Sequence, residues 1–160
     1  MKEKTQDDAA ADTPARTTSR GAEARPIAIL AIGDLIVFLV FAAIGRRSHG
    51  EAAGLDSLLQ IALTAAPFAA GWFIVSPFVG AFREELANQP RKMAWRTLLS
   101  WVASWPLAMI LRGAFVDHGV PPATFATITL VTNTILLLVW RVPYAWLRVL
   151  NTRKREQQAD

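Results

Sequence analysis

Four long apolar runs, separated by short polar links, dominate the pattern along this chain. The apolar residues form continuous blocks, whereas an amphipathic soluble helix has apolar residues only at every third or fourth position. Residues 27–44, at about 1.5 Å each, span about 27 Å, which is just enough to cross the hydrocarbon core of a bilayer. The pattern predicts an all-α, multi-pass integral membrane four-helix bundle in the plasma membrane of a prokaryote, with spans at residues 27–44, 58–79, 95–111 and 123–140.

The flanking segments differ from the spans in composition. Residues 1–26 mix basic and acidic side chains with Ala and Thr, and they have too little apolar surface to offset the entropy of ordering, so we expect a disordered tail. The membrane domain is predicted over 27–150, because the helical pattern of the last span continues past Arg141 and Arg148 as an interfacial extension. A short basic tail, 151–160, follows.

The distribution of Lys and Arg predicts the orientation. Basic residues are concentrated in the N-terminal tail, in the link between the second and third spans, and from Arg141 onward, whereas the other two links contain only Arg46, Arg47 and Arg112. Because cytoplasmic loops of membrane proteins carry an excess of Lys and Arg, we expect both termini in the cytoplasm. Topology therefore accounts for the net charge of +4, and no nucleic-acid partner is predicted.

Asp34 is the most unusual residue of the apolar runs, because a carboxylate inside a span costs about 2.5–3.5 kcal/mol on insertion scales. It lies about 10 Å from the cytoplasmic edge, and Asn133, Ser100 and Ser104 are expected at a similar depth. These four residues are predicted to form an intramembrane polar layer. Asp34 would then serve either as a proton or cation site or as a structural hydrogen-bonding group.

A second polar group is predicted at the opposite membrane surface. The first span ends in a cap that contains Arg46, Arg47, Ser48, His49 and Glu51, which is a candidate site for an anion or a lipid headgroup. The alternative is that the arginines simply extend toward headgroups. The link between the third and fourth spans adds a loop with Arg112, Asp117 and His118, which should face the cap.

The Asp-bearing first span, followed by Gly45-Arg46-Arg47-Ser48-His49-Gly50-Glu51, resembles a family of small prokaryotic membrane proteins known as domain of unknown function 3054. The similarity would cover about Ile27 to Leu150, and the four-span layout and the basic link before the third span also fit that family. The resemblance implies a membrane location and no established activity.

Two functions fit these features. The first is a small transporter or ion-coupled permease subunit that uses Asp34 as a titrating group, as a homo-oligomer or with a membrane partner. The alternative is a structural or interaction protein in which Asp34 is a packing residue. A membrane enzyme that acts on lipid headgroups through Arg46, Arg47 and His49 has the least support. The chain has no Cys, no Gly-rich phosphate loop, no nucleophile elbow and no HExxH, and no cofactor or metal site is predicted.

Overall fold

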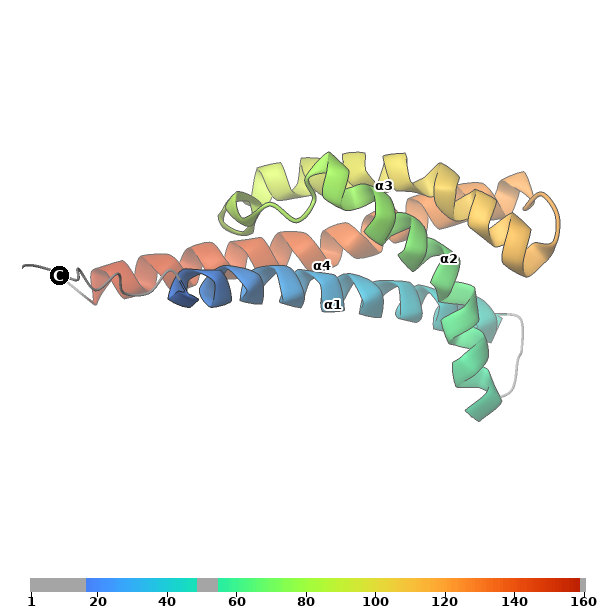
Figure 1. Ribbon diagram of the computed structural model, residues 1–160, viewed down its shortest axis with the longest axis horizontal. Coiled ribbons are helices and arrows are strands. Elements are labelled where there is room, and N and C mark those ends of the chain that lie inside the picture. Colours follow the sequence, from blue (N-terminus) through green and yellow to red (C-terminus); the bar gives the residue numbers. More distant parts are fainter. Residues whose placement is uncertain (1–16, 49–54, 159–160) are drawn as a thin grey trace, which may run out of the picture.

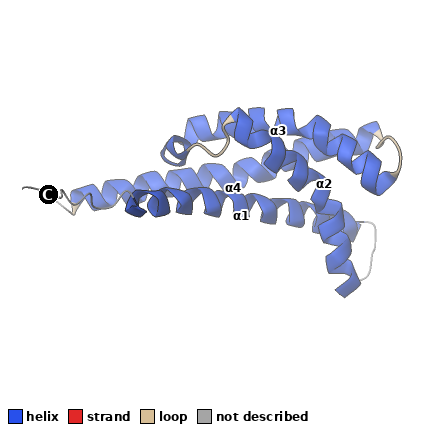
Figure 2. Cartoon of the chain, viewed as in Figure 1, coloured by secondary structure: helices blue, strands red, loops and turns tan. Residues whose placement is uncertain are grey.

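The computed structural model describes residues 17–48 and 55–158, and this part of the chain is helical without a strand (Figure 2). Four long helices account for most of it, and two short helical segments lie in the connections. In chain order the elements are α1 (Thr17–Ser48), α2 (Leu55–Val79), η1 (Glu84–Asn88), α3 (Pro90–Arg112), η2 (Gly113–Asp117) and α4 (Ala123–Gln157). The all-α class predicted from the sequence is confirmed.

Three of the long helices extend well beyond the predicted spans. Residues 17–26, expected to be disordered, belong to α1, so that Pro26 lies inside the helix. Residues 1–16 lie outside the described part of the chain. At the other end α4 continues through the predicted extension and most of the basic tail, and α3 begins with Pro90 at its first position. Apolar content identified the membrane-length segments but not the polar turns that prolong them, because polar residues also form helix.

The four long helices pack as a closed ring. Contacts join α1 to α2, α2 to α3, α3 to α4 and α4 to α1. In Figure 1, α1 and α4 run side by side, and α2 crosses the bundle obliquely. The start of α1, the η1 connection and the end of α4 lie at one end of the bundle, which we call the basic end, and the α3–α4 connection lies at the other.

The core is aromatic. Phe38, Trp72 and Trp101 are fully buried, and Phe38 lies with its ring centroid 5.5 Å from that of Trp101 and 6.4 Å from that of Trp72. The indole nitrogens of Trp101 and Trp105 donate to the carbonyls of Leu130 and Ala126, at 3.0 and 3.1 Å. These hydrogen bonds join α3 to α4 and satisfy the indole nitrogens of the buried Trp101 and the half-buried Trp105.

Two glycines allow close approach of neighbouring helices. A Cβ at Gly33 in α1 would overlap the indole of Trp140 in α4, and a Cβ at Gly71 in α2 would lie 2.9 Å from Ala108 in α3. Small residues at helix contacts let backbones approach closely, as is typical of helices packed within a membrane.

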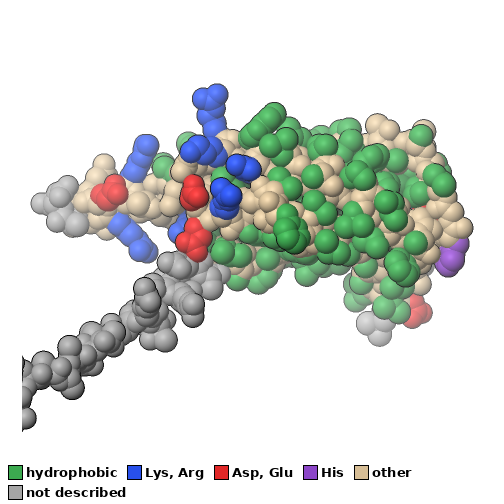
Figure 3. Space-filling view, turned by 45° about the horizontal axis from the view of Figure 1, so that its top comes forward, with side chains coloured by type: hydrophobic (Ala, Val, Ile, Leu, Met, Phe, Trp, Pro, Cys, Tyr) green, Lys and Arg blue, Asp and Glu red, His purple; other side chains and the backbone are tan. Residues whose placement is uncertain are grey.

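All four long helices are long and apolar enough to cross a membrane. Much of the bundle exterior is apolar: Ile36, Leu59, Ile110 and Val139 are each more than half exposed. On the face drawn in Figure 3, apolar side chains cover much of the body, and Lys and Arg gather toward the basic end. This exterior is compatible with a membrane protein.

Candidate functional site

Asp34, near the middle of α1, forms a buried ion pair with Arg141 of α4. Nε of Arg141 donates to Oδ1 at 2.8 Å, and Nη2 donates to Oδ2 at 2.5 Å. Both side chains are completely inaccessible. The two parallel hydrogen bonds give the bidentate geometry in which an arginine binds a carboxylate most specifically.

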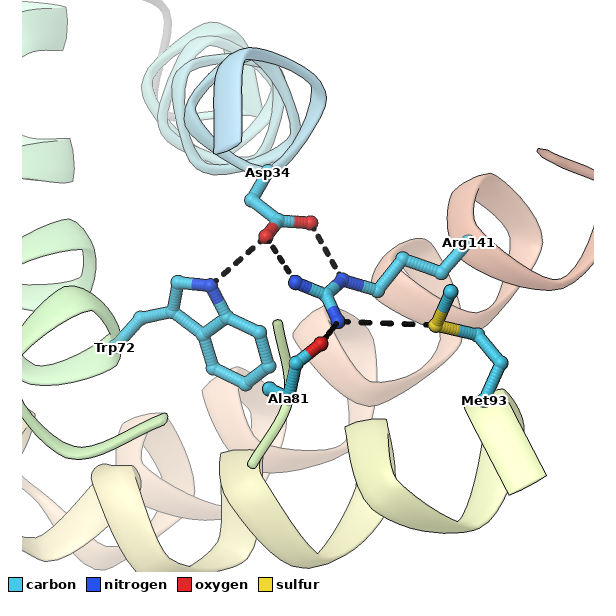
Figure 4. A network of polar contacts seen from close by, with 5 residues as sticks. All are labelled: Asp34, Trp72, Ala81, Met93 and Arg141. Atoms are coloured by element: carbon cyan, nitrogen blue, oxygen red, sulfur yellow. Dashed lines mark hydrogen bonds and ion pairs between the residues drawn. The ribbon is translucent and has the colours of Figure 1, made fainter. Parts of the chain in front are cut away.

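Three further groups contact the two charged side chains (Figure 4). Nε1 of Trp72, from α2, donates to Oδ2 of Asp34 at 3.0 Å. Nη1 of Arg141 donates to the carbonyl of Ala81 at 2.8 Å and lies 3.9 Å from the sulfur of Met93. The site thus connects α1, α2, the turn after α2 and α4.

The end of α2 places the Ala81 carbonyl at the guanidinium. Gly80 adopts a positive φ of 86°, its N–H donates to the carbonyl of Pro77, and the N–H of Ala81 donates to the carbonyl of Ser76. This pair of hydrogen bonds is the Schellman motif that commonly ends a helix at a glycine. Because α2 has ended before Ala81, its carbonyl takes no part in a helical hydrogen bond and accepts one from Arg141.

Aromatic rings surround the guanidinium. Cζ of Arg141 lies 4.9 Å from the ring centroid of Trp72 and 4.8 Å from that of Phe82. A desolvated cation gains about 2 kcal/mol from such a contact. The rings and hydrogen bonds together offset part of the several kcal/mol that each buried charge loses on leaving water.

The structure separates the predicted polar layer into independent groups. Asp34, Asn133, Ser100 and Ser104 are all fully buried. Asn133 nevertheless donates to the carbonyl of Thr129 in its own helix, and Ser104 donates to the carbonyl of Ser100. The hydrogen bonds of Asp34 go to Arg141 and Trp72 instead.

Arg141 is the main residue that sequence reasoning misplaced. We predicted it in an interfacial extension, but its side chain is fully buried. One signal pointed to it: charged residues inside spans usually pair with one another, and Arg141 directly follows the last predicted span. Trp72 gave no signal, because a tryptophan in an apolar run also suits simple packing.

The predicted outer groups lie at the end opposite the basic end. Arg46 is half-buried and Arg47 is exposed, whereas His49 and Glu51 fall outside the described residues, and no side-chain position is described for Ser48. Arg112 and Asp117 form a bidentate ion pair with both distances 3.0 Å. Nδ1 of the exposed His118 lies 3.2 Å from the carbonyl of Val116. Within residues 17–48 and 55–158, no group of three potential metal ligands is found.

These features define a class: an all-helical protein with four membrane-length helices fastened by a buried Asp–Arg pair. A family model matches residues 31–144, and the chain belongs to that family, which is described as protein of unknown function (DUF3054). The match confirms the resemblance inferred from the first span and its cap. It includes both Asp34 and Arg141. No curated protein and no solved structure gives a match.

Proposed function

We propose that this protein is a multi-pass integral membrane protein of the prokaryotic plasma membrane that acts as a structural or partner subunit. The Asp34–Arg141 pair serves in it as a permanent fastener between helices. The single observation that carries the proposal is the complete set of partners of the pair: the carboxylate accepts three hydrogen bonds and the guanidinium donates to two oxygens of Asp34 and to Ala81.

Membrane insertion and orientation are supported by the distribution of side chains. The four long helices have suitable length and composition. The basic end carries Arg91 and Lys92 at the start of α3 and Lys154 and Arg155 near the end of α4. The positive-inside rule then puts this end, and with it both termini, in the cytoplasm.

A fastening role follows from the cost of breaking the pair. Removing one partner of a buried ion pair costs about 3–5 kcal/mol, because the other charge stays buried and uncompensated. A transport site has to exchange its partners in every cycle. The contacts of Asp34 favour a side chain that keeps one set of partners.

Ion-coupled transport is the second candidate, and one observation favours it. The carbonyl that holds Arg141 belongs to the turn between α2 and η1 and not to a helix interior. A movement of this turn would release Nη1 and weaken the pair without unfolding a helix. Asp34 would then bind the proton or cation that Arg141 replaces at rest.

Reconstitution distinguishes the two candidates. Full-length wild-type protein and the Asp34→Asn variant are inserted into liposomes, and proton or sodium flux is followed with an internal dye under an imposed gradient. The fastening role predicts flux no greater than in empty liposomes for both proteins, with lower thermal stability and membrane abundance for Asp34→Asn. Asp56→Asn, which changes an exposed carboxylate at the start of α2, should leave both properties unchanged.

The opposite result would establish transport. It consists of wild-type flux above that of empty liposomes, abolished by Asp34→Asn while the unfolding temperature stays the same. The two measurements separate a lost transport group from a loosened bundle.

A further inference from the structure

A small cavity with two arginines in its wall lies at the end of the bundle opposite the basic end. Its volume is about 230 Å³, and all four long helices contribute to its lining, which consists of Phe41, Ala42, Gly45, Arg46, Thr64, Arg112 and Phe125. We call it the charged cavity. It shares none of these lining residues with the Asp34–Arg141 site.

The structure holds the guanidinium of Arg112 firmly in this wall. Nε and Nη2 bind the carboxylate of Asp117, and Cζ lies 4.2 Å from the ring centroid of Phe125. The third nitrogen, Nη1, is buried and has no hydrogen-bond partner among the described residues. The side chain of Arg112 is only 14% exposed, so its charge is poorly screened by solvent.

The lining of the charged cavity provides donors that suit an anion. Arg112 and Arg46 both line the charged cavity, and Asp117 pairs with Arg112. A guanidinium matches the oxygens of a phosphate through parallel hydrogen bonds, and the hydroxyl of Thr64 adds a further donor to the lining.

A larger cavity lies beside the charged one and shares Thr64 with it. Its volume is about 460 Å³ and its lining is mostly apolar, formed by one side of α2 and by the end of α3 with η2: Gln60, Leu63, Thr64, Ala66, Pro67, Ala70, Leu111, Phe115 and Val116. We call it the apolar cavity. Arg112 follows Leu111 directly in the chain, so the polar and apolar linings are joined on both α2 and α3.

We propose that the two cavities together bind one anionic phospholipid. The phosphate lies against Arg46 and Arg112 in the charged cavity, and an acyl chain lies in the apolar cavity. This juxtaposition of a cationic lining and a larger apolar lining matches the two chemically different parts of an amphiphile. A water-soluble anion has no apolar part that could fill the apolar cavity.

Native mass spectrometry of the full-length protein in mild detergent tests the assignment. The probes are dioleoylphosphatidylglycerol, dioleoylphosphatidylcholine and glycerol phosphate, which separate the effects of charge and acyl chain. We expect the anionic lipid to bind about tenfold more tightly than the zwitterionic one, because the choline cation of the zwitterionic lipid offsets the charge of its phosphate beside the two arginines. Glycerol phosphate should bind more weakly than the anionic lipid.

Variants with matched controls locate the site. Arg46→Gln and Arg112→Gln should each remove the preference for the anionic lipid, whereas Arg47→Gln, beside the cavity lining but exposed, should change its affinity less than about twofold. Ala66→Trp should fill the apolar cavity and weaken lipid binding. Ala62→Trp, one turn earlier and outside that lining, should not.

Asp117→Asn distinguishes a loss of the binding site from a failure to fold. It removes the carboxylate that neutralises Arg112, so it should strengthen binding of the anionic lipid, and a misfolded protein would not show such a gain. Equal binding of the two lipids would overturn the proposal, as would an Arg47→Gln variant as defective as Arg112→Gln. Glycerol phosphate binding as tightly as the lipid, unaffected by Ala66→Trp, would reassign the charged cavity to a soluble anion.

Discussion

The ion pair between Asp34 and Arg141 provides the sharpest test of the energetics, through a cycle of Asp34→Asn, Arg141→Gln and the double variant. Arg141→Gln leaves a buried carboxylate whose remaining donor is Trp72. Asp34→Asn leaves a buried guanidinium that still binds the Ala81 carbonyl. Each single variant therefore contains one uncompensated buried charge.

The expected magnitudes follow from that charge. Each single substitution should lower the free energy of unfolding by about 3–5 kcal/mol. The double variant has two neutral amides in place of the charges and loses mainly hydrogen bonds, each worth about 0.5–1.5 kcal/mol. Its loss should therefore be smaller than the sum of the single losses by about 2 kcal/mol or more. The free energy of unfolding of a domain is only about 5–15 kcal/mol, so the loss from each single substitution should be readily measured.

The assay is reversible unfolding of the full-length protein in mixed micelles, by titration with sodium dodecyl sulfate and detection by circular dichroism. A second cycle with Arg112→Gln and Asp117→Asn is the control, since this pair has the same bidentate geometry but side chains that are 14% and 26% exposed. Its coupling should be smaller than that of the fully buried pair, because both of its side chains keep some contact with solvent. Additive losses at Asp34 and Arg141, within about 0.5 kcal/mol, would refute the argument that the two charges compensate one another.

Two further predictions concern packing and orientation. Gly33→Ala should lower the free energy of unfolding by about 1–3 kcal/mol, because its Cβ overlaps Trp140. Gly45→Ala, whose Cβ meets nothing within 4 Å, should be neutral or stabilising in the same titration with sodium dodecyl sulfate. Because the chain has no cysteine, a membrane-impermeant maleimide applied to intact cells should label Val120→Cys and leave Glu156→Cys unlabelled; the reverse pattern would invert the proposed orientation.

The parts of the fold that depend on local sequence could be predicted. The four apolar runs identified the four long helices, because each run by itself has the length and composition of a span. Asp34 could be recognised from local sequence too, because a single carboxylate inside an apolar run is rare and costly. The helix ends were less predictable, as the polar residues between Thr17 and Pro26 show.

The partners of Asp34 depend on tertiary structure and could not be predicted in the same way. Arg141 is 107 residues away along the chain, and its position at the end of an apolar run is equally typical of a side chain that extends toward headgroups. The prediction that Asn133, Ser100 and Ser104 form a layer with Asp34 depends only on their depth in the membrane. Depth does not determine the rotation of a helix about its axis, and the hydrogen bonds of Asn133 and Ser104 remain within their own helices.

The long separation between Asp34 and Arg141 also has a consequence for biosynthesis. At a synthesis rate of about 5–20 residues per second, the 107 residues between the two take roughly 5–20 s to make. During that time α1 has to enter the bilayer with a carboxylate whose guanidinium partner does not yet exist. Trp72 is synthesised earlier and donates to the same carboxylate. A hairpin of α1 and α2 therefore gives Asp34 a hydrogen-bond donor before α4 is inserted.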